Sequence, residues 1–319
     1  MIRLGLCCIF RDEPIKFVTT TATALGRMER EAGREKLARL CLTNADSLLA
    51  ALNYCAQVGI GCFRINSQIL PLKTHPTAGY AVAELPGGEE IIRRFQLCGQ
   101  FAREHGLRTC FHPDQFVVLN SQRPEVVDSS LAELEYQAEV AEWVGADVIN
   151  IHGGGAYGDK QKALADFARN LDRLSDGVRA RLTVENDDKL FTPADLVPVC
   201  QAAGIPLVYD VHHHRCNRDA LDEESASHEA IATWNREPLF HISSPIDGWH
   251  GPRPGRHHDF IDLKDFPAAW HGLQLTVEVE AKAKELAVLK LKQQLERRAA
   301  RTAAKPVGKS PVNSPAKKR

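Results

Sequence analysis

The sequence predicts an α/β fold of the (β/α)8 TIM-barrel type, in which eight parallel strands form a closed barrel inside a ring of helices. Eight predicted strands alternate strictly with helical segments along the 319 residues. The strands are continuous apolar runs, which is typical of parallel sheets covered on both faces. A doubly wound open sheet is the alternative, but no Gly-x-Gly-x-x-Gly turn follows the first strand. We therefore favour the barrel.

Each predicted strand is a short run of apolar and β-branched residues. The first strand opens the chain, and a long loop rich in threonine and charged residues follows it. The strands are expected at residues 2–8, 62–65, 107–111, 148–151, 181–184, 207–209, 239–242 and 273–279.

The helical segments show apolar residues that recur every three or four positions. In the first segment Leu37, Cys41 and Ala45 belong to such a series, and Gly59 ends it. Pro124 stands in the first turn of another segment, a position that favours proline. Helices are expected at residues 34–58, 89–105, 124–144, 162–174, 193–203, 223–235, 263–270 and 281–300.

Composition excludes several classes of protein. The chain is 44% apolar and 25% charged, enough for one large α/β domain or two small ones. Its nine cysteines are scattered without a Cys-x-x-Cys pair, which argues against a zinc knuckle or a disulfide framework and fits a reducing, cytoplasmic location. No apolar run of membrane-spanning length and no signal-peptide pattern are found, so no membrane partner is expected.

The net charge of −1 hides an asymmetry. Residues 281–319 hold twelve Lys and Arg against two Glu, so this segment carries +10 and the rest of the chain −11. From Ala299 onward the composition predicts disorder. We therefore divide the chain into a barrel domain, 1–285, and a basic C-terminal helix with a disordered tail, 286–319. Such a tail can attract polyanions or only improve solubility.

The stretch from Pro206 to His214 is the strongest functional signal. A short apolar run ends in Asp210, and three histidines follow within four residues. Carboxylate oxygen and imidazole nitrogen side by side suit a divalent metal such as Mn²⁺ or Zn²⁺. The alternative is a polar loop with one capping aspartate and exposed histidines.

Other predicted strands end in the same kind of residue, although a lone histidine at a strand end is usually just hydrogen-bonded. A barrel brings its strand ends to one mouth, so these side chains must meet. So many buried polar groups would be costly without metal, and they are too many for a single ion. The candidates for a cluster of two or three metals are His112, His152, Glu185, Asp210, His213, His241 and Glu280, with His75 and His258 from nearby loops.

A multinuclear site with few nucleophilic side chains points to hydrolysis by a metal-bound hydroxide. Phosphate esters are the natural substrate, because adjacent metals stabilise both the attacking and the leaving oxygen. Lys160 follows a run of glycines and is either a phosphate contact or a solvated lysine at the start of a helix.

With these residues assembled, the chain resembles the UV damage endonuclease family, DNA repair barrels related to endonuclease IV. The resemblance covers nearly the whole folded part, and the order and spacing of the motifs are more specific than any one of them. The matching pieces are Phe63-Arg-Ile, Thr74-His75-Pro76, His112-Pro-Asp-Gln115-Phe116, His152-Gly-Gly-Gly-Ala-Tyr-Gly-Asp-Lys160, Val184-Glu-Asn-Asp-Asp188, Asp210-Val-His-His213, His241-Ile-Ser-Ser244 and Glu280-Ala-Lys282.

The resemblance implies a monomeric enzyme that cuts double-stranded DNA on the 5′ side of a UV photoproduct and leaves a 3′ hydroxyl. It also implies a site of three metals, usually Mn²⁺ with Mg²⁺ or Zn²⁺ as alternatives, held by all nine candidate ligands. Gln115 and Phe116 match the residues that push into the duplex at the lesion, replacing the stacking of flipped-out bases. Without the resemblance, Phe116 would be assigned to core packing.

The chain departs from the family pattern around the lesion. Leu6 and Phe10 stand where a tyrosine and an asparagine are common, and Phe116 replaces a frequent tyrosine. Leu239 stands two residues before His241, where some members carry a modified lysine that bridges metals. Three alternatives therefore stay open: an endonuclease of the abasic-site type or another DNA phosphodiesterase, a sugar isomerase on a similar barrel, and a non-catalytic protein that binds damaged DNA.

Overall fold

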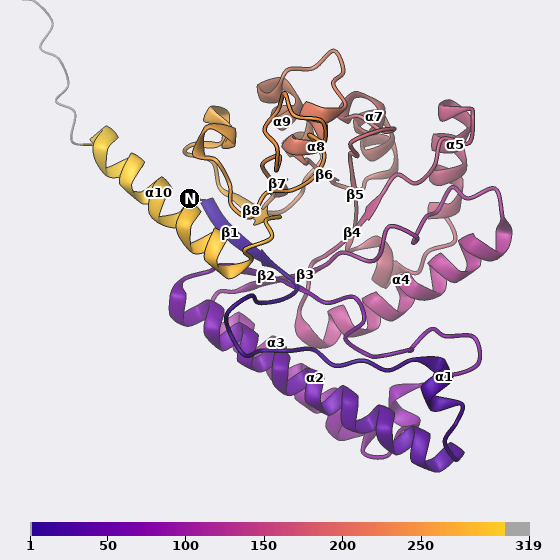
Figure 1. Cartoon of the computed structure of the whole chain (residues 1–319). Coiled ribbons are helices and arrows are strands. Elements are labelled where there is room, and N and C mark those ends of the chain that lie inside the picture. Colours follow the sequence, from indigo (N-terminus) through magenta and orange to yellow (C-terminus); the bar gives the residue numbers. More distant parts are fainter. Residues whose placement is uncertain (1, 304–319) are drawn as a thin grey trace, which may run out of the picture.

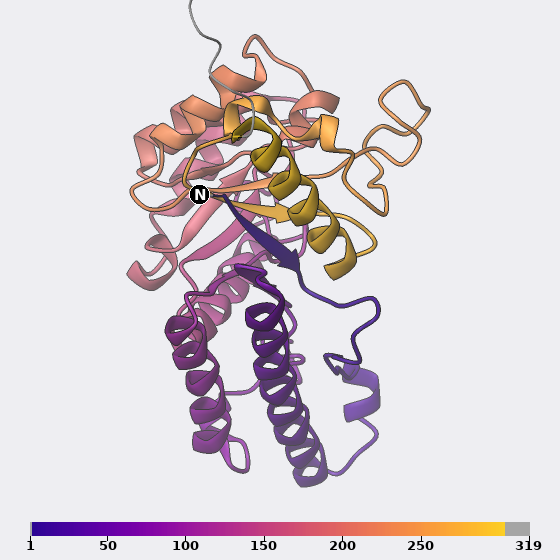
Figure 2. The same ribbon diagram turned by 90° about the vertical axis from the view of Figure 1, so that its left-hand side faces the viewer.

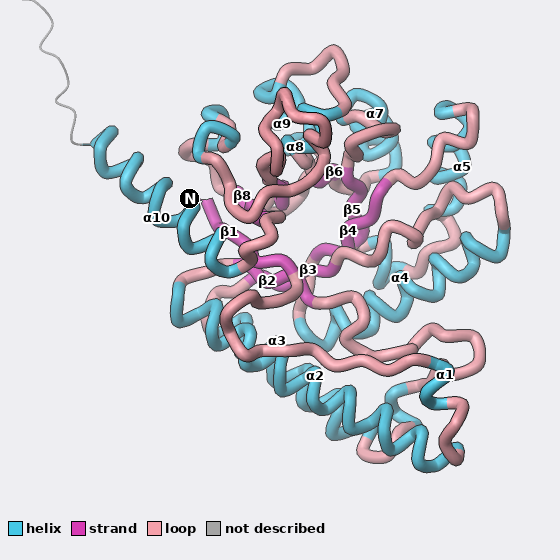
Figure 3. Tube along the Cα trace, viewed as in Figure 1, coloured by secondary structure: helices cyan, strands magenta, loops and turns pink. Residues whose placement is uncertain are grey.

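The computed structural model describes residues 2–303 and consists of a parallel barrel with helices around it (Figure 1). Disorder was predicted from Ala299 onward, but the last helix continues to Ala303, so this boundary was wrong. The rest of the predicted disordered segment lies outside the described residues. The eight strands surround a common centre, and the helices lie outside them (Figure 3). The strands are β1 (Ile2–Cys7), β2 (Cys62–Ile65), β3 (Arg108–Phe111), β4 (Val148–His152), β5 (Leu182–Glu185), β6 (Leu207–Val208), β7 (Leu239–Ile242) and β8 (Leu275–Val279).

All strand pairs are parallel, and their order is β6-β5-β4-β3-β2-β1-β8-β7. The two ends of this series meet where Asp210 forms a bridge with His241 and the His241 amide donates to the Tyr209 carbonyl at 3.0 Å. The barrel is therefore nearly closed, and the predicted (β/α)8 fold is confirmed.

The helices follow the predicted alternation. They are α1 (Ala22–Leu25), α2 (Arg30–Val58), α3 (Gly88–Glu104), α4 (Pro124–Val144), α5 (Lys160–Leu171), α6 (Asp176–Arg179), α7 (Pro193–Ala203), α8 (Val211–Cys216), α9 (Glu223–Ala232) and α10 (Glu285–Ala303), with short 3-10 turns at Val82–Glu84, Leu263–Asp265 and Ala268–Trp270. Helices α2 and α3 run side by side and extend beyond the strands (Figure 2). None of the helices within residues 2–303 has the length and apolar character needed to span a bilayer.

Alternation along the strands separates an apolar outside from a polar inside. Leu6, Phe63 and Phe240 are buried in the main core cluster between strands and helices. Side chains from strands that are not neighbours meet inside the barrel: Arg64 of β2 reaches His241 of β7, and Cys110 of β3 reaches Glu278 of β8. Side chains alternate in direction along a strand, so the neighbours of these core residues point into the barrel. The polar side chains therefore meet in the barrel interior.

The opposite mouth of the barrel is closed by ion pairs. Arg108 donates to both oxygens of Asp147 at 3.0 and 2.8 Å, and Arg3 pairs with Glu237 at 2.9 Å. Above these pairs, Leu239 packs with Cys62, Cys110, Val148 and Val208 in an apolar cluster. This apolar layer lies between the ion pairs and the polar side chains toward the carboxyl ends of the strands.

The C-terminal helix belongs to the folded barrel rather than to a separate basic tail. Val288 and Leu291 of α10 are buried in the core, and Lys292 donates to the Val58 carbonyl at 3.0 Å. At the start of α10, the buried Glu285 accepts hydrogen bonds from the amides of Arg11 and Asp12 at 2.8 and 2.7 Å. The helix thereby fixes the loop that follows β1.

We expect Glu285→Ala to lower the free energy of unfolding by about 3 kcal/mol, because two backbone amides lose a buried, charged acceptor. Urea denaturation measures this change. Glu296→Ala, which removes an exposed carboxylate from the same helix, serves as the control and should change stability by less than about 0.5 kcal/mol. Equal effects of the two substitutions would contradict the role of Glu285.

Candidate metal centre

Seven of the nine predicted ligands meet at the carboxyl end of the barrel. Strand register sets their positions; His152 and Glu185, for example, are partners across β4 and β5. The seven are His112, which follows β3, His152 and Glu185 at the ends of β4 and β5, Asp210 after β6, His213 in α8, His241 in β7 and Glu280 after β8.

Glu185 lies in the middle of this cluster. Its Oε2 is 3.0 Å from His112 Nε2, and its Oε1 is 3.2 Å from His213 Nδ1 and 3.1 Å from His241 Nδ1. Below it, Asn150 donates to Oε2 at 2.6 Å and accepts from the Thr183 hydroxyl at 3.0 Å, which fixes the carboxylate. One buried carboxylate therefore faces three imidazoles.

The donor atoms form three overlapping groups. In each group the nitrogen and oxygen atoms lie within 4.8 Å of one another, as the ligands of one ion must. The groups are His112, His152 and Glu185; His112, His241 and Glu280; and Glu185, Asp210 and His213. Because His112 and Glu185 each belong to two groups, this geometry suits neighbouring cations that share ligands.

Several buried atoms of the cluster have no hydrogen-bond partner within the described residues. They are Glu185 Oε1, Asp210 Oδ2, His152 Nδ1 and His241 Nδ1; Glu185 Oε1 and His241 Nδ1 lie 3.1 Å apart but without the geometry of a hydrogen bond. An unpaired buried polar atom costs about 1–3 kcal/mol, and such atoms are rare in native proteins. Four of them aimed at one volume fit divalent cations, and imidazole with carboxylate suits Mn²⁺ or Zn²⁺.

Opposite charges compensate one another within the cluster. Burial alone would raise the pKa of Glu185, but the nearby His241 and His152 hold it well below its usual range. Burial alone would lower the pKa of His241, but Glu185 raises it to about 10. The pKa of His213 is also raised well above normal, against burial, by Asp210 and Glu185. Imidazolium charge thus balances the carboxylates.

The histidine triplet is not a loop, because Asp210 caps the short helix α8. The Asp210 carboxylate accepts from the His213 amide at 2.8 Å. Successive helical residues point in different directions, so only His213 reaches the centre. His212 packs against the Trp249 ring with centroids 5.1 Å apart, and His214 bonds the Tyr209 hydroxyl at 2.8 Å.

The loop after β7 brings His257, not the predicted His258, to the cluster. Nδ1 of His257 lies 3.8 Å from Glu280 Oε2, whereas His258 is exposed and its Nδ1 accepts from the Phe260 amide at 3.0 Å. His75 sits in another loop, where its Nδ1 faces the amides of Thr77 and Ala78 at 3.3 Å. Neither His75 nor His258 belongs to the three donor groups.

Lys160 is engaged elsewhere. Its ammonium group forms an ion pair with Asp195 of α7 at 2.9 Å and lies over the Phe191 ring. This pairing does not support a phosphate contact.

Besides His257, the sequence analysis missed two residues at the centre. Arg64 bonds Glu280 Oε1 at 2.7 Å, and Glu278 lies 2.9 Å from His241 Nε2. Glu278 could have been found, since residues two apart on a strand share a face and Glu280 was already a candidate.

A cavity of about 1050 Å³ opens above the centre. His112, His152, Glu185, His213 and Glu280 line it together with Gln115 and Phe116. Phe116 is 74% exposed, so it is not a core residue. Asp114 shapes its turn by accepting from the Phe116 amide at 3.1 Å.

Comparison with known proteins identifies the family. The family model described as UV-endonuclease UvdE matches residues 2–310. The chain belongs to the UvdE family. Curated UV DNA damage endonucleases of Bacillus velezensis and Bacillus cereus are 34% and 30% identical to it, covering 90% and 86% of this chain and 91% and 87% of theirs. This UvdE-family chain is therefore an endonuclease, and the predicted resemblance is confirmed.

Solved structures agree with this assignment. The crystal structure of SacUVDE matches this UvdE-family chain with a TM-score of 0.84 at 27% identity, covering 94% of this chain and 99% of that one. Endonuclease IV from Thermus thermophilus matches with a TM-score of 0.61 at 14% identity, covering 94% of this chain and 99% of its own, which shows a shared fold.

The glycine loop after β4 generates a prediction about how the centre is held. Asn120 donates to the carbonyls of Gly153 and Gly155 at 2.7 and 2.9 Å. Gly154 has φ +83°, and a Cβ there would lie 2.1 Å from Asn120 Oδ1. Gly154→Ala combines left-handed strain with the loss of both bonds, so it should lower the free energy of unfolding by about 3 kcal/mol.

Gly158→Ala is the matched control, because Gly158 has φ +86° and open space around its Cα. Gly158→Ala should lower the free energy of unfolding by about 1 kcal/mol, because it introduces conformational strain alone. Chemical denaturation of both variants gives the difference. If the two variants lose equal stability, Asn120 does not hold the loop.

Proposed function

We propose that this chain is a metal-dependent DNA repair endonuclease that hydrolyses the phosphodiester on the 5′ side of a UV photoproduct. Family membership supports action on damaged DNA, since the curated relatives are named UV DNA damage endonucleases. The observation that carries the metal dependence is the set of buried, unpaired nitrogen and oxygen atoms at the carboxyl end of the barrel.

The cation ligands in this proposal are the seven clustered residues and His257. His75 and His258 would require a change in their loops to join them, so they are weaker candidates. The three donor groups support a cluster of up to three ions, with Mn²⁺ preferred and Mg²⁺ or Zn²⁺ as alternatives. When bound, such cations supply the positive charge that activates water and stabilises the charge developing on the phosphate.

The surrounding residues keep the ligands in place. Arg64 and Asn150 orient Glu280 and Glu185, and Asp210 both faces the centre and caps the helix that carries His213. The centre forms the floor of an open cavity, so a phosphate can approach it from solvent while the ligands stay fixed. Rigid ligands lower the cost of reorganisation during phosphodiester hydrolysis.

Phe116 and Gln115 are the proposed lesion probes. Phe116 stands exposed on the rim of the cavity, where an aromatic ring can fill the gap left by damaged bases. Leu6 is fully buried, and Phe10 packs against the rings of Tyr54 and Phe63 with centroids 5.4 and 5.8 Å apart. The turn that carries Gln115 and Phe116 therefore contributes more to recognition of the lesion in this chain than the loop after β1.

We expect this chain to nick an end-labelled duplex on the 5′ side of a single cyclobutane dimer. Nicking should require Mn²⁺ and should be abolished by EDTA. His152→Ala should reduce nicking by at least about 100-fold, since it removes a proposed metal ligand. His105→Ala, at an exposed histidine that stacks on Phe101, is the control and should leave nicking unchanged.

An abasic duplex and an undamaged duplex, tested in parallel, separate the alternatives. Cutting at the abasic site alone would move the substrate to base-loss repair. Tight binding of irradiated duplex without cutting by the metal-loaded protein would indicate a damage-binding protein. Turnover of aldoses but not of any duplex would support the sugar isomerase.

We expect Phe116→Ala to reduce the preference for the dimer over undamaged duplex by about 10-fold, the worth of one base–aromatic stack. Because the side chain is exposed, the free energy of unfolding should change by less than about 0.5 kcal/mol. Leu97→Ala, at an exposed apolar residue of α3 away from the cavity, is the control. Unchanged discrimination in Phe116→Ala would rule out its probing role.

A further inference from the structure

We propose that Glu278 is a positioning residue of the metal centre, which orients His241 so that its Nδ1 faces the metal ions. The proposal rests on the metal dependence proposed above. Glu278 is fully buried one layer below Glu280, on the same inward face of β8. It is a partner of His241 in the register of β7 and β8, so the backbone itself places the two side chains side by side.

The two nitrogens of His241 face different surroundings. Nδ1 lies 3.1 Å from Glu185 Oε1 and 3.5 Å from Glu280 Oε1, in the volume shared by the proposed ligands. Nε2 points down the barrel and lies 2.9 Å from Glu278 Oε2. A carboxylate accepts a hydrogen bond from the Nε2–H group and so keeps the proton on Nε2, which leaves Nδ1 with a free lone pair for a cation.

Arg64 would otherwise favour the opposite arrangement. Its Nη2 lies 3.0 Å from His241 Nε2, and as a donor it could only bond an unprotonated Nε2. That arrangement would put the imidazole proton on Nδ1, facing the cations. Glu278 prevents this outcome by accepting from Arg64 as well, with the Arg64 Nε at 2.8 Å and Nη2 in direct contact.

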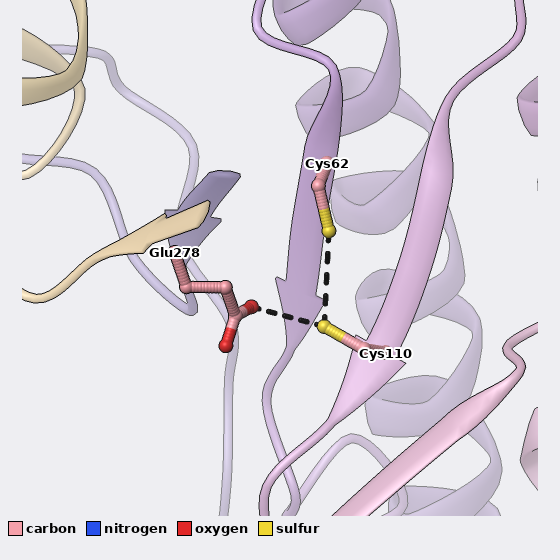
Figure 4. Close-up of side chains that lie close together, drawn as sticks. All are labelled: Cys62, Cys110 and Glu278. Carbon is pink, nitrogen blue, oxygen red and sulfur yellow. Dashed lines mark hydrogen bonds between the residues drawn. The ribbon is translucent and has the colours of Figure 1, made fainter. Parts of the chain in front are cut away.

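Glu278 is held in place on its other side by a thiol. The Cys110 thiol donates to Glu278 Oε1 at 3.0 Å, and Cys62 lies 3.9 Å from Cys110, as Figure 4 shows. Gly5 leaves room for the side chain, since a Cβ there would lie 3.2 Å from Glu278 Cγ. Both carboxylate oxygens thus have partners.

Cys62, Cys110 and Glu278 could also be viewed as a metal site of their own, since their donor atoms lie within 4.8 Å of one another. The guanidinium of Arg64, already bonded to Glu278, opposes a second cation there. Burial also raises the pKa of the Cys110 thiol well above normal, whereas a metal would need the thiolate. We therefore assign the trio to positioning.

The test is a Mn²⁺ titration of the metal-free full chain, with free Mn²⁺ followed by electron paramagnetic resonance. Glu278→Gln should weaken the binding of one Mn²⁺ by about 10–100-fold, the usual effect of removing a carboxylate partner from a ligand histidine. The number of ions bound at saturation should not change. Asp147→Asn, the same charge change at the opposite mouth, should bind like the wild type.

Three results would overturn the proposal, and they differ from one another. Wild-type affinity in Glu278→Gln, with lowered stability, would make Glu278 only a structural partner of Arg64. The loss of one bound ion in both Glu278→Gln and Cys110→Ser would indicate a thiol metal site. Failure of the wild type itself to bind any divalent cation would refute the metal-dependent function together with this inference.

A measurement on the wild type covers the case in which Glu278→Gln does not fold. Long-range ¹⁵N–¹H spectra of the Zn²⁺-loaded chain distinguish the two ring nitrogens of a histidine, with His241 assigned by its absence in His241→Asn. We expect the proton on Nε2 and the metal on Nδ1. The reverse assignment would overturn the proposal.

Discussion

The carboxyl end of this barrel depends on the balance of charge among side chains that are largely buried at the floor of an open cavity. Glu185, Asp210, Glu278 and Glu280 bring four carboxylates together, and Arg64 is the guanidinium that lies among them. A buried charge without compensation costs several kcal/mol, so the remaining negative charge must be met by protonated imidazoles or by cations. In the proposed function, the same imidazoles would become ligands when cations replace their protons. Folding and the proposed metal binding would therefore draw on one set of interactions.

Much of this arrangement could be predicted from the sequence, because the strand ends of a parallel barrel converge whatever the details of the loops. The apolar runs predicted the eight strands, and the polar residue after each run predicted the cluster from His112 to Glu280. Alternation along a strand also contained the signal for Glu278. No such rule predicted Arg64. A charged residue inside an apolar run only interrupts the strand pattern, and nothing in the sequence indicates the two carboxylates that Arg64 contacts.

The loops were less predictable for a physical reason. His257 and His258 are neighbours, and which of them faces the centre is decided by the bridge between Pro245 and His257, a pairing distant in sequence. The short helix α8 was missed because its start depends on the Asp210 cap, and a capping role for Asp210 was considered only within a polar loop. The ion pair of Lys160 could not be predicted for the same reason, because its partner Asp195 lies on another helix.

The pairing of β1 with β8 has a consequence for how the chain is made. Residues 2–6 pair with residues 275–279, and Glu285 bonds the amides that follow β1. During synthesis the first strand must wait, with one edge unpaired, until almost the whole barrel has left the ribosome. Contacts this distant in sequence form slowly, and exposed strand edges favour aggregation in the meantime. The cluster is also incomplete until Glu280 emerges, so a nascent chain cannot assemble the full set of ligands early. Under the proposed metal dependence, loading with cations would therefore be a late step that follows closure of the barrel.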